Sequence, residues 1–136
     1  MSKRKTKAAG PPSMDVTPGQ EYRVLSLHPE WAWAIVFGGK DIEYRSWTTK
    51  YRGLLLIHAS SKGSAKDGYP KSTILGAVDL VDVIDVGPDN KEWVLRNPRQ
   101  LTQPVADVPG KLQIWRWVAP GKAVRAQPNR QASAAR

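Results

Sequence analysis

The stretch that decides the fold covers residues 26–60 and reads SLHPEWAWAIVFGGKDIEYRSWTTKYRGLLLIHAS. It overlaps the end of YRVLSL, residues 22–27, whose alternation of apolar and polar side chains predicts a strand. Pro29 suits the first turn of a helix, and the apolar run after it ends at Gly38 and Gly39, where a helix is expected to stop. This stretch therefore predicts a strand followed by a helix of about two and a half turns.

Strand patterns continue on both sides of a polar loop. DIEYRSW at residues 41–47 alternates, and LLLIHAS at residues 54–60 predicts a buried strand. Residues 61–71 are polar and glycine-rich, which predicts a loop. Residues 72–86, STILGAVDLVDVIDV, form a long strand-like run in which the alternation slips. Either a bulge or a curl with both faces partly covered accounts for that slip.

Two further elements complete the expected fold. Residues 91–96 are expected to form a second short helix, and KLQIWRWV at residues 111–118 predicts a final strand. About six strands, with one short helix after the first strand and another before the last, indicate an α+β fold built as a small mixed β-barrel.

The two ends of the chain differ in composition from the middle. Residues 1–20 hold four basic residues and one acid, and residues 119–136 hold four basic residues and no acid, in a chain of net charge +9. Both segments have few large apolar groups, so we expect disordered basic tails around one folded domain at residues 21–118. Such tails either attract a polyanion such as nucleic acid or only solubilise the chain.

Composition also excludes several kinds of site. The chain has no cysteine, which rules out disulfides and thiolate chemistry, and its two histidines, His28 and His58, are too few for a metal site. We therefore expect no metal and no cofactor. The longest apolar run, residues 31–37, is far shorter than a membrane span, and no apolar stretch follows the basic N-terminus. We expect a soluble protein of the cytoplasm, or of the nucleus in a eukaryote.

Four residues after the helix carry the chemistry of a candidate cleft. Glu43, Arg45 and Trp47 alternate in the predicted strand and are expected to share one face, with Lys40 close by. Cations hold phosphate, an indole stacks on a base, and a carboxylate accepts hydrogen bonds from a base amino group. The structural alternative is an ion pair between Glu43 and Arg45, with Trp47 in the core.

Other aromatic and basic residues leave a choice of roles. Because Trp31 and Trp33 lie two residues apart on a short helix, we expect one of them to be a core residue and the other to be half-exposed, and we favour Trp31 as the one that lines the cleft. His58 lies in an apolar strand, where a hydrogen-bonded structural histidine is expected before a catalytic one. Arg52 precedes Gly53 and either reaches phosphate or stabilises a turn. The tryptophans of the last strand, Trp115 and Trp117, are expected to pack in the core.

The combined motif resembles the ASCH domain, a family named for its homology to a transcriptional coactivator. The matching residues are Ser26-Leu27, Pro29, Trp31-Ala32, Gly38 or Gly39 with Lys40, Glu43, Arg45, Trp47, Arg52-Gly53, Ile57-His58-Ala59, ILGAVDLVDV, Asn97-Pro98 and GKLQIWRW. The resemblance covers about residues 22–118. One departure is Glu30, which separates Pro29 from Trp31 where the family often has them contiguous.

The resemblance implies a PUA-like β-barrel with a cleft suited to RNA, DNA or a nucleoside. Relatives include coactivator domains, proposed nucleases and amidohydrolases of acylated nucleosides, so the fold leaves activity open. The amidohydrolases use Lys-x-x-Thr and a distant glutamate. Lys40 matches that lysine, but Glu43 stands in place of the threonine, and Glu92 is the one later glutamate. A metal-independent nuclease would pair Lys40 with the hydroxyl of Tyr44, Ser46 or Tyr51.

We therefore expect a nucleic-acid-binding module rather than an enzyme. Its expected partner is RNA or another single-stranded nucleic acid, or a nucleoside. We expect no membrane as a partner. The expected ligand-binding residues are Trp31, Lys40, Glu43, Arg45, Trp47 and Arg52. The alternatives are a small hydrolase, either a ribonuclease or an amidohydrolase of a modified nucleoside, and a protein-interaction domain in transcription or RNA regulation.

Overall fold

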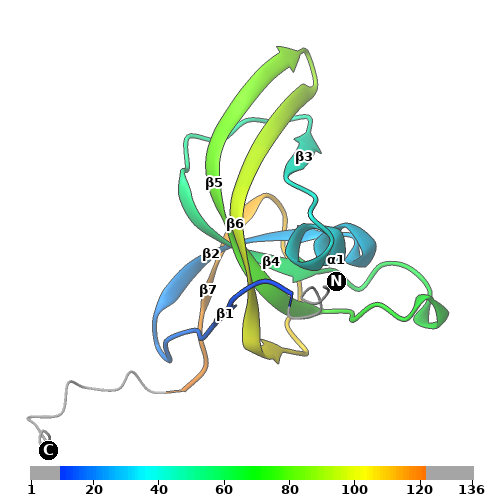
Figure 1. The fold of residues 1–136 in the computed structure, drawn as a ribbon, viewed down its shortest axis with the longest axis vertical. Helices are drawn as coiled ribbons and strands as arrows, with labels where there is room; N and C mark the ends of the chain where they lie inside the picture. Colours follow the sequence, from blue (N-terminus) through cyan, green and yellow to red (C-terminus); the bar gives the residue numbers. More distant parts are fainter. Residues whose placement is uncertain (1–9, 122–136) are drawn as a thin grey trace, which may run out of the picture.

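Within residues 10–121, the part of the chain that the computed structural model describes, seven strands form one strongly twisted mixed sheet with a helix packed against it (Figure 1). The elements are β1 (Ser13–Met14), β2 (Glu21–Leu27), α1 (Pro29–Phe37), β3 (Ile42–Arg45), β4 (Gly53–Ala59), the 3-10 helix η2 (Ala65–Asp67), β5 (Thr73–Gly87), β6 (Asn90–Val105) and β7 (Ile114–Val118). The strand order is β1-β6-β5-β4-β2-β7, and β3 also pairs with β6. The sheet is barrel-like without closing, which confirms the expected fold class.

Helix α1 begins and ends where the local signals predict. Pro29 occupies its first turn, and the N–H of Gly38 donates to the carbonyl of Ala34 at the other end. Gly39 follows with φ of 81°, in the left-handed region that glycine adopts without a steric penalty. The helix buries Ala32, Ile35 and Val36, and it covers strands β4, β5 and β6.

The long β5 and β6 strands wrap around the sheet and rise beyond it as a two-stranded arm, beside which β3 lies (Figure 1). Their antiparallel pairing has register shifts at four places: Ile74/Gly76, Ala77/Asp79, Leu80/Asp82 and Asp85/Gly87. These bulges explain why the alternation of residues 72–86 slips, and of the two explanations offered from the sequence they are the first. Near the first bulge the backbones approach so closely that a Cβ on Gly76 would lie 2.1 Å from the Arg99 carbonyl oxygen.

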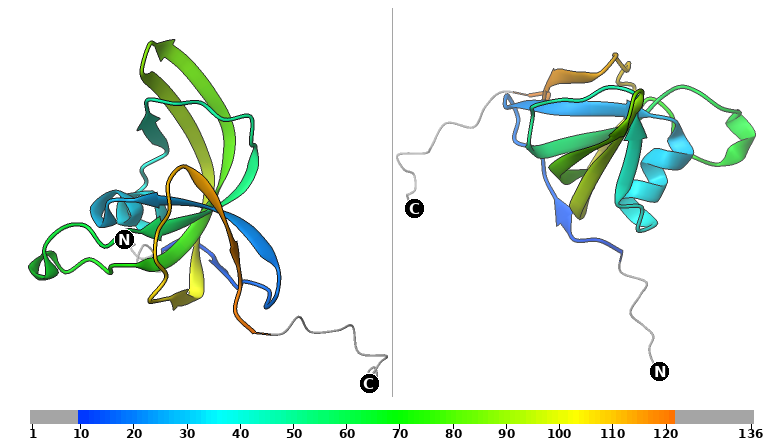
Figure 2. Two further views of the ribbon diagram at one scale, coloured as in Figure 1. Left: turned by 180° about the vertical axis from the view of Figure 1, so that it is seen from behind. Right: turned by 90° about the horizontal axis from the view of Figure 1, so that it is seen from above.

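Two apolar clusters lie on opposite faces of the sheet. The first lies under α1 and includes Ile35, Leu55, Leu80 and Trp93. The second includes Tyr22 and Trp115. Helix α1 and the loop between β4 and β5 lie on the same side of the molecule, as the view from above shows (Figure 2). In residues 10–121 no helix is long and apolar enough to cross a membrane.

Two expectations about secondary structure and boundaries are wrong. Residues 91–96 are part of β6 and not a short helix, because Trp93 and Leu95 both enter the cluster under α1, and a helix would turn them apart. The loop predicted at residues 61–71 is present, and it holds the three-residue 3-10 helix η2.

The expected N-terminal tail is also too long. The disorder predicted for residues 1–20 does not apply to residues 11–20, because β1 pairs in parallel with β6 at Ser13 and Met14. The Gly19 N–H donates to the carbonyl of Ala119, which is buried, so the folded unit also extends past residue 118. The tail predictions for residues 1–9 and 122–136 lie outside the described residues.

Candidate functional site

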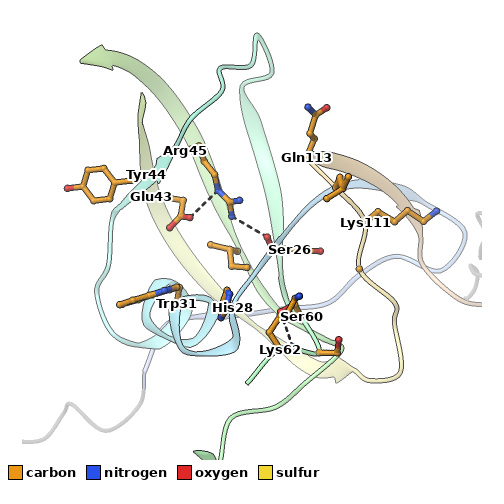
Figure 3. Close-up of a pocket in the computed structure, with 14 residues that line it drawn as sticks. Ser26, His28, Trp31, Glu43, Tyr44, Arg45, Ser60, Lys62, Lys111 and Gln113 are labelled. Carbon is orange, nitrogen blue, oxygen red and sulfur yellow. Dashed lines mark hydrogen bonds and ion pairs between the residues drawn. The ribbon is translucent and has the colours of Figure 1, made fainter. Parts of the chain in front are cut away.

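A cleft of about 490 Å³ opens where helix α1, strand β3, the start of the β4–β5 loop and the segment before β7 meet (Figure 3). Its lining residues are Ser26, Leu27, His28, Trp31, Glu43, Tyr44, Arg45, Ser60, Ser61, Lys62, Gly110, Lys111, Leu112 and Gln113. Parallel strands β2 and β4 lie side by side, so the residues after their carboxyl ends meet at one edge of the sheet. That edge supplies His28 and Trp31 after β2, and Ser60 to Lys62 after β4.

The walls carry three cations and two exposed aromatic rings. The cations are Arg45, Lys62 and Lys111, which come from three separate segments. The rings are Trp31 and Tyr44, with 49% and 59% of their surfaces exposed. Figure 3 shows both rings on one side of the cleft and Lys111 on the other. Such a combination suits an anionic ligand with a flat ring.

The one carboxylate of the cleft, Glu43, is buried between two cations. Its Oε1 lies 3.4 Å from Lys40 Nζ, and its Oε2 lies 3.1 Å from Arg45 Nε. The buried Arg45 Nε–H is not aligned for a hydrogen bond to Glu43, although the two groups are at ion-pair distance. A second nitrogen of the guanidinium, Nη2, donates to the carbonyl of Ser26 at 3.2 Å. Arg45 is therefore held from both β2 and β3.

Lys40 contacts both rings of the aromatic wall but does not line the cleft itself. Its Nζ is 5.8 Å from the ring centroid of Trp31 and 5.3 Å from that of Tyr44. It also donates to the carbonyl of Ile42. Cation–π attraction and the pairing with Glu43 therefore fix the charge between the two rings.

A hydrogen-bonded chain runs from Ser26, which lines the cleft, to Val108. His58 is fully buried, and its Nε2 donates to the Val108 carbonyl at 2.6 Å, since a carbonyl only accepts. In the neutral ring Nδ1 then accepts from the Ser26 hydroxyl at 2.9 Å, and Trp115 Nε1 donates to the same hydroxyl oxygen at 3.0 Å. Burial lowers the pKa of His58, which favours this neutral form. His58 is thus a hydrogen-bonded buried residue, as expected.

Besides Lys40, four of the expected site residues do not line the cleft. Strand β3 ends at Arg45, so Trp47 does not share its face; the Trp47 ring packs edge-on against Trp93, with centroids 4.7 Å apart. Arg52 donates to the carbonyls of Thr49 and Tyr51, outside the cleft. Ser46 is exposed beyond the end of β3 and does not line the cleft either.

Tyr51 is the fourth, and its hydroxyl is engaged away from the cleft. It donates to the carbonyl of Leu54, and burial raises the pKa of the phenol. Of the hydroxyls proposed for catalysis, Tyr44 alone lines the cleft. Within residues 10–121 no group of three or more histidine, aspartate or glutamate side chains could hold a metal ion.

The helical tryptophans also differ from expectation. Trp33 is not a core residue: 40% of its surface is exposed, so both helix tryptophans are half exposed and lie on different sides of α1. Trp115 is buried as expected, and Trp117 is partly buried beside Tyr22.

Sequence reasoning missed the residues that follow β4 and precede β7, chiefly Lys62, Lys111 and Gln113. The polar run SSK after the apolar strand IHA was a usable signal for the first of these. No local pattern marked the segment before β7.

Comparison with known proteins agrees with this architecture. Residues 25–106 match the ASCH domain. The chain belongs to the ASCH domain family. The ASCH domain was the family inferred from the motif, and the structure has the expected barrel-like mixed sheet with α1 after β2.

Two curated relatives of this ASCH protein are activating signal cointegrators. Activating signal cointegrator 1 of Homo sapiens and that of Mus musculus are each 36% identical to it over 81 residues. The match covers 44% of this chain and 14% of each cointegrator, so the chain corresponds to a small part of those proteins. A solved structure of a mutant ZmASCH protein from Zymomonas mobilis is 18% identical, with a TM-score of 0.48, over 63% of this chain and 76% of that one.

Proposed function

We propose that this ASCH domain binds RNA or another single-stranded nucleic acid through the cleft, without turning it over. One observation carries the proposal: Arg45, Lys62 and Lys111 converge from three segments on a cleft that is also lined by the exposed rings of Trp31 and Tyr44. Membership of the ASCH family supports an RNA-binding type of domain in general.

The charges suit a phosphate-bearing ligand. Glu43 already lies between Lys40 and Arg45, whereas no acidic partner lies within 4.0 Å of Lys62 or Lys111 in the part of the chain that the structure describes. Cations without partner carboxylates gain most from a polyanion, because binding releases the counterions of the nucleic acid. The volume of about 490 Å³ falls in the range typical of small-ligand sites. A single nucleotide of a longer strand is therefore the unit that we place in the cleft.

The binding proposal is preferred to a hydrolase because the candidate catalytic groups do not converge. Lys40 lies against the rings of Trp31 and Tyr44 and does not line the cleft. Ser46 lies beyond the end of β3, and the Tyr51 hydroxyl donates to the carbonyl of Leu54. A nucleophile and its base must lie within hydrogen-bond reach of each other and of one reacting atom. Lys40 and Tyr44 are neighbours, but their contact is between the ammonium and the ring face.

The test compares two arginines, Arg45 in the lining of the cleft and Arg52 outside it. Binding of single-stranded RNA, single-stranded DNA and duplexes is measured by fluorescence anisotropy across a salt series, with product analysis on the same samples. Arg45→Ala is expected to weaken single-strand binding by about 1–3 kcal/mol, and Arg52→Ala to leave it within about 0.5 kcal/mol. Equal losses for the two variants, or no binding by the wild type, would rule out the cleft as the site.

A further inference from the structure

A second group of aromatic side chains lies beside the cleft, on the far side of helix α1 from Trp31. We call Trp33, Phe37 and Tyr69 the Trp33 platform. The ring centroid of Trp33 lies 4.2 Å from that of Phe37 and 6.3 Å from that of Tyr69. Phe37 packs against the core, whereas 40% of the Trp33 surface is exposed. The platform is thus an exposed indole that packs on Phe37, which is itself held by the core.

One loop connects the cleft with the platform. Ser60, Ser61 and Lys62 line the cleft, and Tyr69, in the same β4–β5 loop, contacts Trp33. Figures 1 and 2 show this loop on the same side of the molecule as α1, projecting beyond the helix. A chain that leaves the cleft past Lys62 therefore reaches Trp33 without crossing the core.

The surroundings of the platform are basic. The loop carries Lys62, Lys66 and Lys71 against one acid, Asp67, and the Lys71 ammonium lies 2.6 Å from that carboxylate. No carboxylate lies within ion-pair distance of Lys62 or Lys66 among residues 10–121. Two unmatched cations beside an exposed ring complement a backbone of phosphates and a stacked base.

We propose that a single-stranded RNA held in the cleft continues past Lys62 and stacks a further base on Trp33. The ligand class is then a strand of several nucleotides and not a lone nucleoside or nucleotide. This inference rests on the proposed function, since the cleft must bind the first nucleotide. Stacking on an indole does not depend on base identity, because every base has a π-face, so this second position adds affinity and little sequence preference.

The test measures how affinity depends on RNA length, with the full chain. Calorimetric affinities for a trinucleotide and anisotropy affinities for a decanucleotide are compared in wild type, Trp33→Leu and Trp31→Ala. Trp33→Leu keeps an apolar group on Phe37 and is expected to weaken decanucleotide binding roughly tenfold while the trinucleotide is unaffected. Trp31→Ala, which alters the cleft itself, is expected to weaken both.

Each other outcome has a definite meaning. If Trp33→Leu weakens both RNAs equally, or neither, the second stacking position does not exist. If Trp33→Leu fails to fold, or if its melting temperature falls while both affinities stay unchanged, the platform only stabilises the loop, and the proposal is wrong. If Trp31→Ala and Arg45→Ala leave both affinities unchanged, the function proposed for the cleft fails as well.

Discussion

The Oε2 atom of Glu43 lies 3.1 Å from Nε of Arg45, and both residues come from β3 and line the cleft. The carboxylate is buried and also lies 3.4 Å from Lys40 Nζ, so it balances two cations at once. The pair is thus both part of the packing around β3 and part of the wall that a ligand would meet.

Glu43→Gln is expected to lower the free energy of unfolding by about 1–3 kcal/mol, because the buried Arg45 Nε loses its anion. Urea denaturation of the four proteins in a cycle with Arg45→Met measures the coupling between the two residues. A coupling near zero would show that water replaces the carboxylate without cost. RNA binding of Glu43→Gln at low salt should be no weaker than that of the wild type, since the cleft loses its one negative charge.

Lys40→Arg is expected to retain RNA affinity within about threefold, because the charge between Trp31 and Tyr44 survives the substitution. Lys40→Met, which removes the charge and keeps much of the length, should bind more weakly. A protein that cleaves RNA or an acylated nucleoside, and loses that activity in Lys40→Arg, would show that the lysine must give up a proton, and would make the protein an enzyme.

Stability is expected to fall as the pH drops below about 6.5, and His58 is the cause. Burial holds the pKa of His58 below 6.5 in the folded protein, whereas the unfolded chain takes up a proton near that value. The stabilisation is complete above pH 6.5 and is lost between that pH and the lower pKa of the folded state. His58→Gln should be less stable at pH 7.5 and should show a flatter pH dependence from pH 6.5 to 5.

Thermal denaturation of His58→Gln alongside the wild type checks this prediction, and His28→Gln is the matched control at an exposed histidine. An identical slope in wild type and His58→Gln would assign the pH dependence to other groups.

Gly110→Ala is expected to weaken RNA binding and to destabilise the fold by about 1–3 kcal/mol. An added Cβ would lie 2.9 Å from Ser26 Oγ and 3.0 Å from His58 Cε1, so the segment that carries Lys111 would have to move away from them. Leu112→Ala is the control for stability in the same segment, since Leu112 lines the cleft but is 89% exposed. Crystal structures or amide spectra of both variants show whether the segment has shifted; an unmoved segment in Gly110→Ala would contradict the prediction.

Residues 2–9 and 122–136 should contribute to RNA affinity but not to stability, whereas residues 10–20 should contribute to stability. Deleting residues 2–9 and 122–136 removes eight basic residues and no acid. It is expected to leave the melting temperature within about 2 °C and to flatten the dependence of RNA affinity on salt. Extending the N-terminal deletion to residue 20 removes β1 and should lower the melting temperature by about 5–10 °C. A short deletion that already lowers it that far would show that residues 2–9 or 122–136 pack on the domain.

Local signals in the sequence determined most elements and the family. Pro29 and the Gly38-Gly39 pair bound the helix because they act on the backbone of their own neighbourhood, through a fixed φ and through access to positive φ. The alternation of residues 22–27 and the apolar run at 54–60 likewise need no distant partner to be recognised. Glu43 and Arg45 were found as a pair for the same reason, since they lie two apart in one strand.

The tertiary structure alone decided the conformation of residues 91–96 and which side chains line the cleft. Residues 91–96 became a strand because Trp93 and Leu95 are covered by α1, which is more than fifty residues away in sequence. Trp47 packs against the core because β3 ends at Arg45. Lys62 lies in the cleft because β4 pairs in parallel with β2, and Lys111 lies there because the segment before β7 is held at Val108 by His58. Each of these depends on contacts between segments far apart in the chain, and the periodicity within one segment does not report which other segment will cover it.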